Sequence, residues 1–386
     1  MAVSFHPPPR RILVRGVNWL GDAVMTTPAL IRLREKYREA HITLLTPEKL
    51  RDLWRHHPTV DEVIGFAAGE GLFSVGRKLR AGKFDLALVL PNSPRSAMEI
   101  WLAGIPQRIG YARSWRNGFL TRAVPTRPGH VQMRKPSIRE IRRLIDDPQT
   151  VTDGFKPQTT AHQIYEYLHL IATLGASDEP TPPSLVITPT EVEAAKQKFG
   201  LLESLKAARP FFGLNPGAEY GPAKRWPAER FIAAAREIQE RTNCEWLIFG
   251  GKRDAALADG IHSALRTPHS ALHDLAGQTS LRELMALLKL CRVLLANDTG
   301  PMHVAAALGT PVVVPFGSTS PELTGPGLPG DLRHHLLKSD APCAPCFLRE
   351  CPIDFRCLNG IGVERVAAAV MEAVTAGAGT EKQFEK

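Results

Sequence analysis

Apolar residues in the first half of the chain form short runs, and segments with helical spacing separate these runs. The runs with the length and composition of buried strands are 11–17, 41–46, 60–66 and 84–92. The segments with apolar residues on one helical face are 22–37, 71–82 and 161–176. Strands that alternate with helices in this way predict βαβ units and a parallel sheet.

The second half of the chain begins the same pattern again. Its predicted strands are 210–217, 245–251, 292–298 and 311–317, and its predicted helices are 226–242, 280–291, 299–309 and 363–374. The two halves share few identical residues, so the repeat is one of architecture. We expect an α/β protein with two doubly wound domains that face a central cleft, with ligands bound beyond the carboxyl ends of the strands.

A Pro-rich stretch, ASDEPTPPSL at 176–185, marks the boundary between these two halves. The stretch after Trp115 is rich in Arg, Pro and Gly, and we expect loop with short helices there. The predicted division is a disordered extension over 1–10, a first domain over 11–177, a linker over 178–190, a second domain over 191–362, and a C-terminal helix and tail over 363–386.

The length of 386 residues agrees with two domains, and the formal net charge of +9 favours anionic partners. Such partners are nucleic acid, phosphorylated substrates or an anionic membrane face. No aromatic residues interleave with the basic ones as single-strand binding requires, so nucleic acid is disfavoured. No apolar run approaches the length of a spanning helix, and the Pro-rich N-terminus is not a secretory signal, so we expect a cytoplasmic protein.

Two segments of the second half have the features of a phosphate site. In LNPGAEYGPAKRWP (214–227) a predicted strand ends in a Gly- and Pro-rich loop, and Lys224 and Arg225 precede a helix. Free N–H groups at a helix start attract phosphate, and two cations reinforce this. The alternative is a solvated loop whose cations merely precede a helix.

The other segment follows the predicted strand 292–298. Thr299 and Gly300 open a helix of small residues and offer hydroxyl and amide donors to a diphosphate. Asp298 can instead act as a simple helix cap. His303 lies one turn into the helix, on the face that Thr299 shares, and is either a ligand contact or a structural residue.

The loop after the first predicted strand carries a carboxylate, Asp22, at the start of a helix. An anion there is electrostatically favourable and would repel a phosphate, so this loop is a poor nucleotide cradle. Asp22 is either a first-turn acidic residue of structural value or a general base that takes a proton from an acceptor hydroxyl.

Basic and polar residues also crowd after the predicted strand 84–92. They are Asn92, Ser93, Arg95, Arg108, Arg113, Arg116 and Arg122. Such a cluster suits an acidic, polyhydroxyl acceptor, and the alternative is a merely basic surface.

Four of the six cysteines form a C-x2-C-x4-C-x5-C array: Cys343, Cys346, Cys351 and Cys357. This array is either a zinc site or a set of free structural thiols, because its spacing is not that of a standard zinc ribbon or finger. Cys244 and Cys291 lie in apolar contexts and are expected to be buried, reduced thiols.

From about residue 11 to 372 the chain resembles the ADP-heptose:lipopolysaccharide heptosyltransferases. The stretches that carry the resemblance are ILVRGVNWLGDAVMTTPAL, VLPNSPRSA, AGIPQRIGY, NPGAEYGPAKRWP, LAGQTSL and NDTGPMHVAAALGTPVVVPFGSTSP. VLPNSPRSA and NPGAEYGPAKRWP are typical of the type II branch, which adds a heptose to the first heptose of the inner core. The Cys-rich stretch is also similar to one found in many type II sequences.

The resemblance implies a GT-B fold of two Rossmann-like domains and an inverting transfer in which ADP leaves. It places ADP-heptose, the donor substrate, in the second domain and the lipopolysaccharide inner-core acceptor in the first, with no required cofactor and with the enzyme peripheral to the cytoplasmic face of the inner membrane. Asp22 falls on the family's proposed general base. Type I relatives bind the ribose through a Glu after the strand equivalent to 245–251. Here the run is GGKRDA, so Asp254 substitutes or the contact is absent.

The predicted site residues therefore form two groups beside Asp22. The donor group is Asn215, Gly217, Lys224, Arg225, Asp254, Asp298, Thr299, Gly300 and His303, and the acceptor group is Gly21, Asn92, Ser93, Arg95, Arg108 and Arg113. Other functions consistent with this architecture are a type I or another ADP-heptose transferase, a sugar-nucleotide epimerase, and a non-catalytic nucleotide-sugar-binding or membrane-scaffold protein. The Arg-rich acceptor loop argues against the epimerase.

Overall fold

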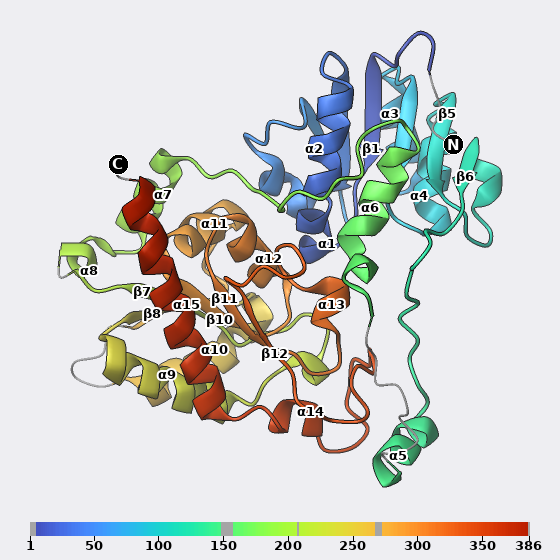
Figure 1. The fold of residues 1–386 in the computed structure, drawn as a ribbon. Coiled ribbons are helices and arrows are strands. Elements are labelled where there is room, and N and C mark those ends of the chain that lie inside the picture. The colour runs from blue at the N-terminus through green and yellow to red at the C-terminus, as the bar shows by residue number, and fades with distance from the viewer. Residues whose placement is uncertain (1–4, 148–156, 207, 267–271, 385–386) are drawn as a thin grey trace. The chain divides into compact units, whose positions relative to one another are not determined.

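The chain forms two compact units. The computed structural model describes residues 5–147, 157–206, 208–266 and 272–384 (Figure 1). The first unit consists of Met1–His130 and Thr160–Val186, and the second consists of Val131–Thr159 and Ile187–Lys386. The chain therefore passes from the first unit to the second, returns to the first unit at Thr160, and enters the second unit again at Ile187.

The core of the first unit is a parallel sheet in the order β3-β2-β1-β4-β5-β6. Its strands are β1 (Arg11–Arg15), β2 (His41–Pro47), β3 (Glu62–Phe66), β4 (Leu86–Val89), β5 (Gln107–Tyr111) and β6 (Arg122–Val124). Leu13 of β1 pairs with Thr43 on one side and Ala87 on the other. A parallel sheet is covered by helices on both faces, which explains why the predicted strands are continuous apolar runs.

Helices of the first unit cover both faces of this sheet. They are α1 (Leu20–Met25), α2 (Thr27–Lys36), α3 (Leu72–Arg80), α4 (Pro94–Leu102) and α6 (Gln163–Ala172), with short 3₁₀ helices η1 (Glu48–Trp54), η2 (Asn117–Phe119) and η4 (Thr159–Ala161). The helix predicted over 22–37 is broken at Thr26, because Pro28 lacks an N–H, and a new helix begins at Thr27 with Pro28 in its first turn. α6 packs beside α2 (Figure 1), and Tyr37 at the end of α2 donates a hydrogen bond to the Leu174 carbonyl at 2.9 Å.

The second unit repeats this architecture. Its strands are β7 (Phe211–Asn215), β8 (Glu245–Ile248), β9 (Leu272–Asp274), β10 (Val293–Ala296), β11 (Val312–Pro315) and β12 (His335–Leu337). They are parallel and lie in the order β12-β11-β10-β7-β8-β9. Numbered within its own unit, this order is the same as that of the first sheet, and it is the doubly wound order of nucleotide-binding sheets.

Helices and short 3₁₀ helices complete the second unit. They are α5 (Ile138–Asp146), α7 (Pro189–Lys198), α8 (Leu202–Lys206), α9 (Ala228–Thr242), α10 (Ala255–Leu265), α11 (Leu281–Leu290), α12 (Gly300–Ala307), α13 (Pro321–Thr324), α14 (Arg356–Asn359) and α15 (Val363–Phe384), with η5 (Pro222–Lys224) and η6 (Lys252–Asp254). α15, red in Figure 1, packs against α9 and buries Val366 and Val370 in the core that contains Phe212 and Trp246. None of the helices within the described residues is long and apolar enough to cross a membrane.

The segment after residue 130 differs from the prediction, which placed it in the first domain. It belongs to the second unit, where Ile141 of α5 is buried and faces a small cavity also lined by Ala344 and Ile353. Ile141 is the buried residue of α5, and it lines this cavity together with residues of the Cys-rich stretch, a contact that the Arg- and Pro-rich sequence around it did not reveal. The boundary between the units falls at Val186, inside the predicted linker.

A buried ion pair joins β1 to α4 at the carboxyl edge of the first sheet. Arg15 Nε lies 2.9 Å from Glu99 Oε2, and the two side chains are 3% and 0% exposed. Arg15 also donates to Asn18 Oδ1 at 3.0 Å, and Arg95 of α4 donates to the second oxygen of Glu99 at 2.9 Å. Glu99 therefore ties the loop that follows β1 to the start of α4.

Replacing Glu99 with Ala should destabilise the first unit by about 3–5 kcal/mol, because it leaves the Arg15 guanidinium buried without a counter-charge. Urea denaturation, with each unit's transition followed separately, measures this loss. The control is Glu35→Gln, which removes a partly exposed pair with Arg32 and should cost less than about 1 kcal/mol. Equal losses in the two variants would contradict the role given to Glu99.

Candidate functional site

In each sheet the strand order reverses between two neighbouring strands. These neighbours are β1 and β4 in the first unit and β7 and β10 in the second. The loops that leave such neighbours diverge to opposite faces, so a crevice opens beyond their carboxyl ends. The predicted site residues follow these strands, and the geometry of each edge decides which of them meet.

In the second unit an ion pair connects the loop after β7 to the loop after β10. Lys224 Nζ lies 2.6 Å from Asp298 Oδ2, and both side chains are largely buried. The same carboxylate oxygen accepts a hydrogen bond from the Thr319 hydroxyl, which follows β11. Lys224 also lies over the Tyr220 ring, 4.9 Å from its centroid. Three strand ends thus place a cation, a carboxylate and a hydroxyl together.

The Asn297 side-chain amide connects these two loops through two hydrogen bonds. Its Oδ1 accepts from the Trp226 N–H at 2.9 Å, and its Nδ2 donates to the Pro216 carbonyl at 2.7 Å. Asn297 is fully buried, so both bonds replace bonds to water that the backbone groups could not otherwise make. The Lys224 loop is consequently fixed to the end of β10 at both of its ends.

The loops after β7 and β8 also pack closely together. A Cβ added to Gly217 would lie 2.5 Å from the Asp254 carboxyl carbon, so a larger residue at position 217 would displace the Asp254 carboxylate. Asp254 accepts a hydrogen bond from the Gly251 N–H at 3.0 Å and lies 3.7 Å from the Arg225 guanidinium. Asn215, the last residue of β7, donates weakly to the Gly217 carbonyl at 3.5 Å. The structure therefore brings Asp254 beside the Lys224 loop.

α12 begins at this same edge, directly after Asp298. Thr299 is its N-cap and Gly300 its first residue, and no side-chain hydrogen bond caps the helix. With eight residues, α12 presents the positive end of its dipole and its first N–H groups beside the Lys224 ammonium. His303, inside the helix, is 5% exposed. This combination of a helix start and a lysine is suited to binding a diphosphate.

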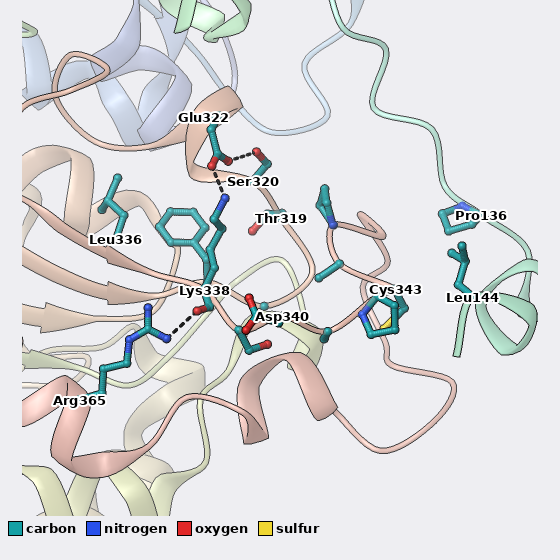
Figure 2. Close-up of a pocket in the computed structure, with 17 residues that line it drawn as sticks. Pro136, Leu144, Thr319, Ser320, Glu322, Leu336, Lys338, Asp340, Cys343 and Arg365 are labelled. Carbon is teal, nitrogen blue, oxygen red and sulfur yellow. Dashed lines mark hydrogen bonds and ion pairs between the residues drawn. The ribbon is translucent and has the colours of Figure 1, made fainter. Parts of the chain in front are cut away.

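A cavity of about 700 Å³ continues the edge beyond Asp298, at the ends of β11 and β12. Figure 2 shows its polar side, where Glu322 lies between the Ser320 hydroxyl and the Lys338 ammonium. Arg365 of α15 donates to the Lys338 carbonyl at 2.7 Å, and the ring of Pro136 lies on the far side. The hydroxyl groups of Thr319 and Ser320 and the carboxylate of Glu322 thus line a polar cavity beside this edge.

The Cys-rich stretch forms hydrogen bonds to the Lys224 loop through its backbone carbonyl groups. The Ala223 N–H donates to the Arg349 carbonyl at 3.0 Å, and the Tyr220 hydroxyl donates to the Phe347 carbonyl at 2.7 Å. Gly221, at φ 153°, has no room for a Cβ, which would lie 2.5 Å from the Arg349 oxygen. The stretch therefore fixes the shape of the loop that carries Lys224.

The four cysteines of this stretch line one small cavity as free thiols. Burial raises the pKa of Cys343 and Cys346, and raises that of Cys357 to about 12, so these groups are protonated at neutral pH. Within the described parts of the chain, no group of three or more His, Cys, Asp or Glu side chains is arranged to hold a metal ion.

In the first unit, Asp22 lies in the first turn of α1, and Gly21 immediately precedes it. The Arg15–Asn18 hydrogen bond fixes the loop that leads to this turn. Burial, and then the nearby Asp22 charge, raise the pKa of Tyr167 well above its ordinary value. Asp22 thus lies close to the Tyr167 side chain of α6, in the first turn of a helix.

Polar residues after β4 and β5 lie at the same edge. Ser93 is the N-cap of α4 and accepts from the Ser96 N–H at 3.2 Å, and Asn92 beside it is exposed. Arg95 is bonded to Glu99 and to the Glu70 carbonyl. Arg113 donates to the Thr126 hydroxyl at 2.7 Å. Asn92, Ser93, Arg95 and Arg113 are therefore grouped with the strand ends of the first sheet.

Arg108 does not join this group. It lies near the start of β5, paired with Ala87 of β4, while the other residues follow strand ends. Its guanidinium donates to the Phe119 carbonyl at 2.7 Å and to the Ile105 carbonyl at 2.6 Å, and burial lowers its pKa. The prediction is corrected here: Arg108 holds together the loops at the opposite edge of the sheet.

Several residues of both edges were not among the predicted site residues. Glu99 and Thr319 act through contacts between distant segments, and no local pattern marks them. Asn297 lies at the end of the predicted strand 292–298, and this position was the only available signal. Arg116, which the sequence placed in a basic cluster, is fully buried rather than on the surface.

Comparison with known proteins agrees with this geometry. Residues 72–355 match the family model described as glycosyltransferase family 9 (heptosyltransferase). The chain is 32% identical over 330 residues to lipopolysaccharide heptosyltransferase 2 of Escherichia coli K12, covering 82% of this chain and 85% of that protein. It is also 32% identical over 329 residues to lipooligosaccharide heptosyltransferase 2 of Haemophilus ducreyi, covering 82% and 86%.

Solved structures show the same fold. The structure of E. coli ADP-heptose LPS heptosyltransferase II matches with a TM-score of 0.72 and 28% identity, covering 95% of this chain and 99% of that one. A family 9 glycosyltransferase from Veillonella parvula matches with a TM-score of 0.75 at 24% identity, covering 95% and 97%. The predicted GT-B fold of two Rossmann-like domains is confirmed, and the cleft between them stays a prediction. The chain belongs to glycosyltransferase family 9, the heptosyltransferases.

Proposed function

We propose that this chain transfers a heptose from ADP-heptose to the first heptose of the lipopolysaccharide inner core. The observation that carries the proposal is the meeting of Lys224, Asp298 and the start of α12 at the strand-order reversal of the second sheet. The similarity to lipopolysaccharide heptosyltransferase 2 of E. coli supports this choice of donor and acceptor.

On the donor side, the ADP diphosphate accepts hydrogen bonds from the first N–H groups of α12 and from Lys224. Asp298 holds the ammonium in place before the donor arrives, because the two groups are 2.6 Å apart. Arg225 and Asp254 border the same loop and face the nucleoside. Fixed donors of this kind stabilise the charge that develops on ADP as the glycosidic bond breaks.

On the acceptor side, Asp22 takes the proton of the attacking hydroxyl. The oxygen then attacks the anomeric carbon of the donor from the face opposite ADP, so the configuration is inverted and ADP carries away the bonding electron pair. This single displacement requires the two carboxyl edges to approach each other. Asn92, Ser93, Arg95 and Arg113 are proposed to hold the acceptor. Catalysis of this kind typically contributes a factor of 10²–10⁴ from the base.

The acceptor is a lipid-linked saccharide, so the enzyme is proposed to work at the cytoplasmic surface of the inner membrane. The formal net charge of +9 favours contact with an anionic leaflet. ADP-heptose itself is the donor substrate, and no step of the proposed reaction requires a cofactor.

The purified chain should transfer heptose to an inner-core acceptor that already carries one heptose, and release one ADP for each transfer. The measurement is ADP release together with mass spectrometry of acceptors that bear zero or one heptose. Transfer to the acceptor without heptose alone would assign the chain to the type I reaction, and transfer to neither would reject the proposed function.

Replacing Asp22 with Asn should lower kcat by about 10²–10⁴-fold, because the amide cannot accept the proton. The dissociation constant for ADP, measured by calorimetry, should stay within about twofold of wild type, since Asp22 belongs to the other unit. A variant that binds donor normally and transfers as fast as wild type would show that Asp22 is not the base.

Replacing Lys224 with Ala should weaken ADP binding by about 10–100-fold, the usual effect of losing one hydrogen bond to a charged group. Calorimetric titration with ADP measures the change. Arg349→Ala is the matched control, because Arg349 is exposed and lies over the same Tyr220 ring, 5.1 Å from its centroid. Equal effects from both variants would indicate that loop packing alone, and not the Lys224 charge, determines the affinity.

A further inference from the structure

The Arg116 side chain is a buried charge that its surroundings do not balance. NH1 donates to the Pro91 carbonyl at 2.7 Å and to Asn92 Oδ1 at 3.3 Å. Nε and NH2 are buried and have no hydrogen-bond partner among the described residues. Burial, followed by repulsion from Arg113, lowers the pKa of Arg116 to about 10, so the guanidinium still carries its charge at neutral pH.

Other buried guanidinium groups of the chain have carboxylate partners. Arg15 is paired with Glu99 at 2.9 Å, and Arg282 is paired with Glu191 at 2.6 Å. Arg116 forms no ion pair with any carboxylate in the parts of the chain that the structure describes. An unpaired charge in a protein interior is strongly destabilising. A bound anion near Arg116 would reduce this cost.

The absence of a side chain at Gly110 leaves space for the Arg116 guanidinium. A Cβ added to Gly110 of β5 would lie 2.8 Å from Arg116 NH2 and 3.1 Å from the Val89 carbonyl. Any larger residue at position 110 would therefore displace the arginine. The guanidinium lies at the carboxyl end of β4 and β5, where it contacts Pro91 and Asn92 in the loop that follows β4.

The surface above Arg116 has the properties of an anion site. α4, nine residues long, begins at Pro94, so the positive end of its dipole lies at this loop. The Arg116 guanidinium can only donate, so it occupies Asn92 Oδ1 and leaves the exposed Asn92 Nδ2 to donate outward. Arg113 adds a second positive charge nearby.

We propose that Asn92, Arg113 and the start of α4 form a subsite for a phosphoryl or carboxylate group of the acceptor saccharide, with Arg116 as the positioning residue beneath it. Arg116 orients the Asn92 amide, and the bound anion supplies the counter-charge that the described residues do not provide. This inference rests on the proposed function, because it names the part of the acceptor that the first unit recognises.

Asn92→Asp is the sharpest test, because it gives Arg116 a carboxylate in place of an amide of the same shape. The thermal midpoint of the first unit should rise by a few degrees, since the buried charge gains a partner. The acceptor KM should rise about tenfold or more, because the new carboxylate repels the acceptor anion, while the donor KM stays within about twofold. Asn243→Asp, at an exposed position of the second unit, is the control for one added negative charge.

Arg116→Met provides the complementary test with three acceptors: the native one, one with its phosphoryl groups removed, and one with its carboxylates reduced to alcohols. Wild type should lose about tenfold in kcat/KM with one of the altered acceptors, which identifies the anion. Arg116→Met should no longer distinguish that acceptor from the native one, and its thermal midpoint should not fall.

Several results would overturn the inference. One is a wild type indifferent to both altered acceptors, and another is an Arg116→Met variant that keeps the wild-type preference. An Asn92→Asp variant with unchanged acceptor KM would do the same, even if Arg116→Met did not fold. Failure of the proposed function looks different, because wild type would then transfer heptose to none of the three acceptors.

Discussion

A reversal of strand order is the constraint on which both candidate sites depend. Where two neighbouring parallel strands send their loops to opposite faces, the backbone cannot close over the sheet, and a crevice remains at the carboxyl edge. The chain has this arrangement twice, between β1 and β4 and between β7 and β10. The residues after these strands differ in charge. Asp22 follows the first sheet's central strand, and the loop with Lys224 follows the second sheet's, which is why the diphosphate is proposed to bind at the second edge.

Each edge is held in place by one buried polar side chain that connects distant segments. In the first unit the Glu99 carboxylate joins the end of β1 to the start of α4 through Arg15 and Arg95. In the second unit the Asn297 amide joins the loop after β7 to the end of β10. Both side chains satisfy groups that are shielded from water, so the loops have little freedom to move apart. Such rigidity suits a reaction that depends on preorganised charge.

The sequence was sufficient to predict the architecture and the shared edge of Lys224 and Asp298. Buried parallel strands are continuous apolar runs, and residues that follow such strands lie at one edge. Asp254 was added to this group only through the family resemblance. The failures have physical causes. QRIGY begins with polar residues and was not recognised as β5, so Arg108 was predicted at an edge where its strand starts rather than ends. α5 lies in an Arg- and Pro-rich stretch, and only tertiary packing assigns it to the second unit.

In the proposed reaction the second sheet binds the nucleotide and the first sheet activates the acceptor. A crystal structure of the chain with bound ADP distinguishes these two roles. The diphosphate should lie against Lys224 Nζ and the N–H groups at the start of α12, beside the Asn297-bridged loops. A diphosphate bound at the start of α1, against the loop that carries Asp22, would show that the roles are assigned wrongly.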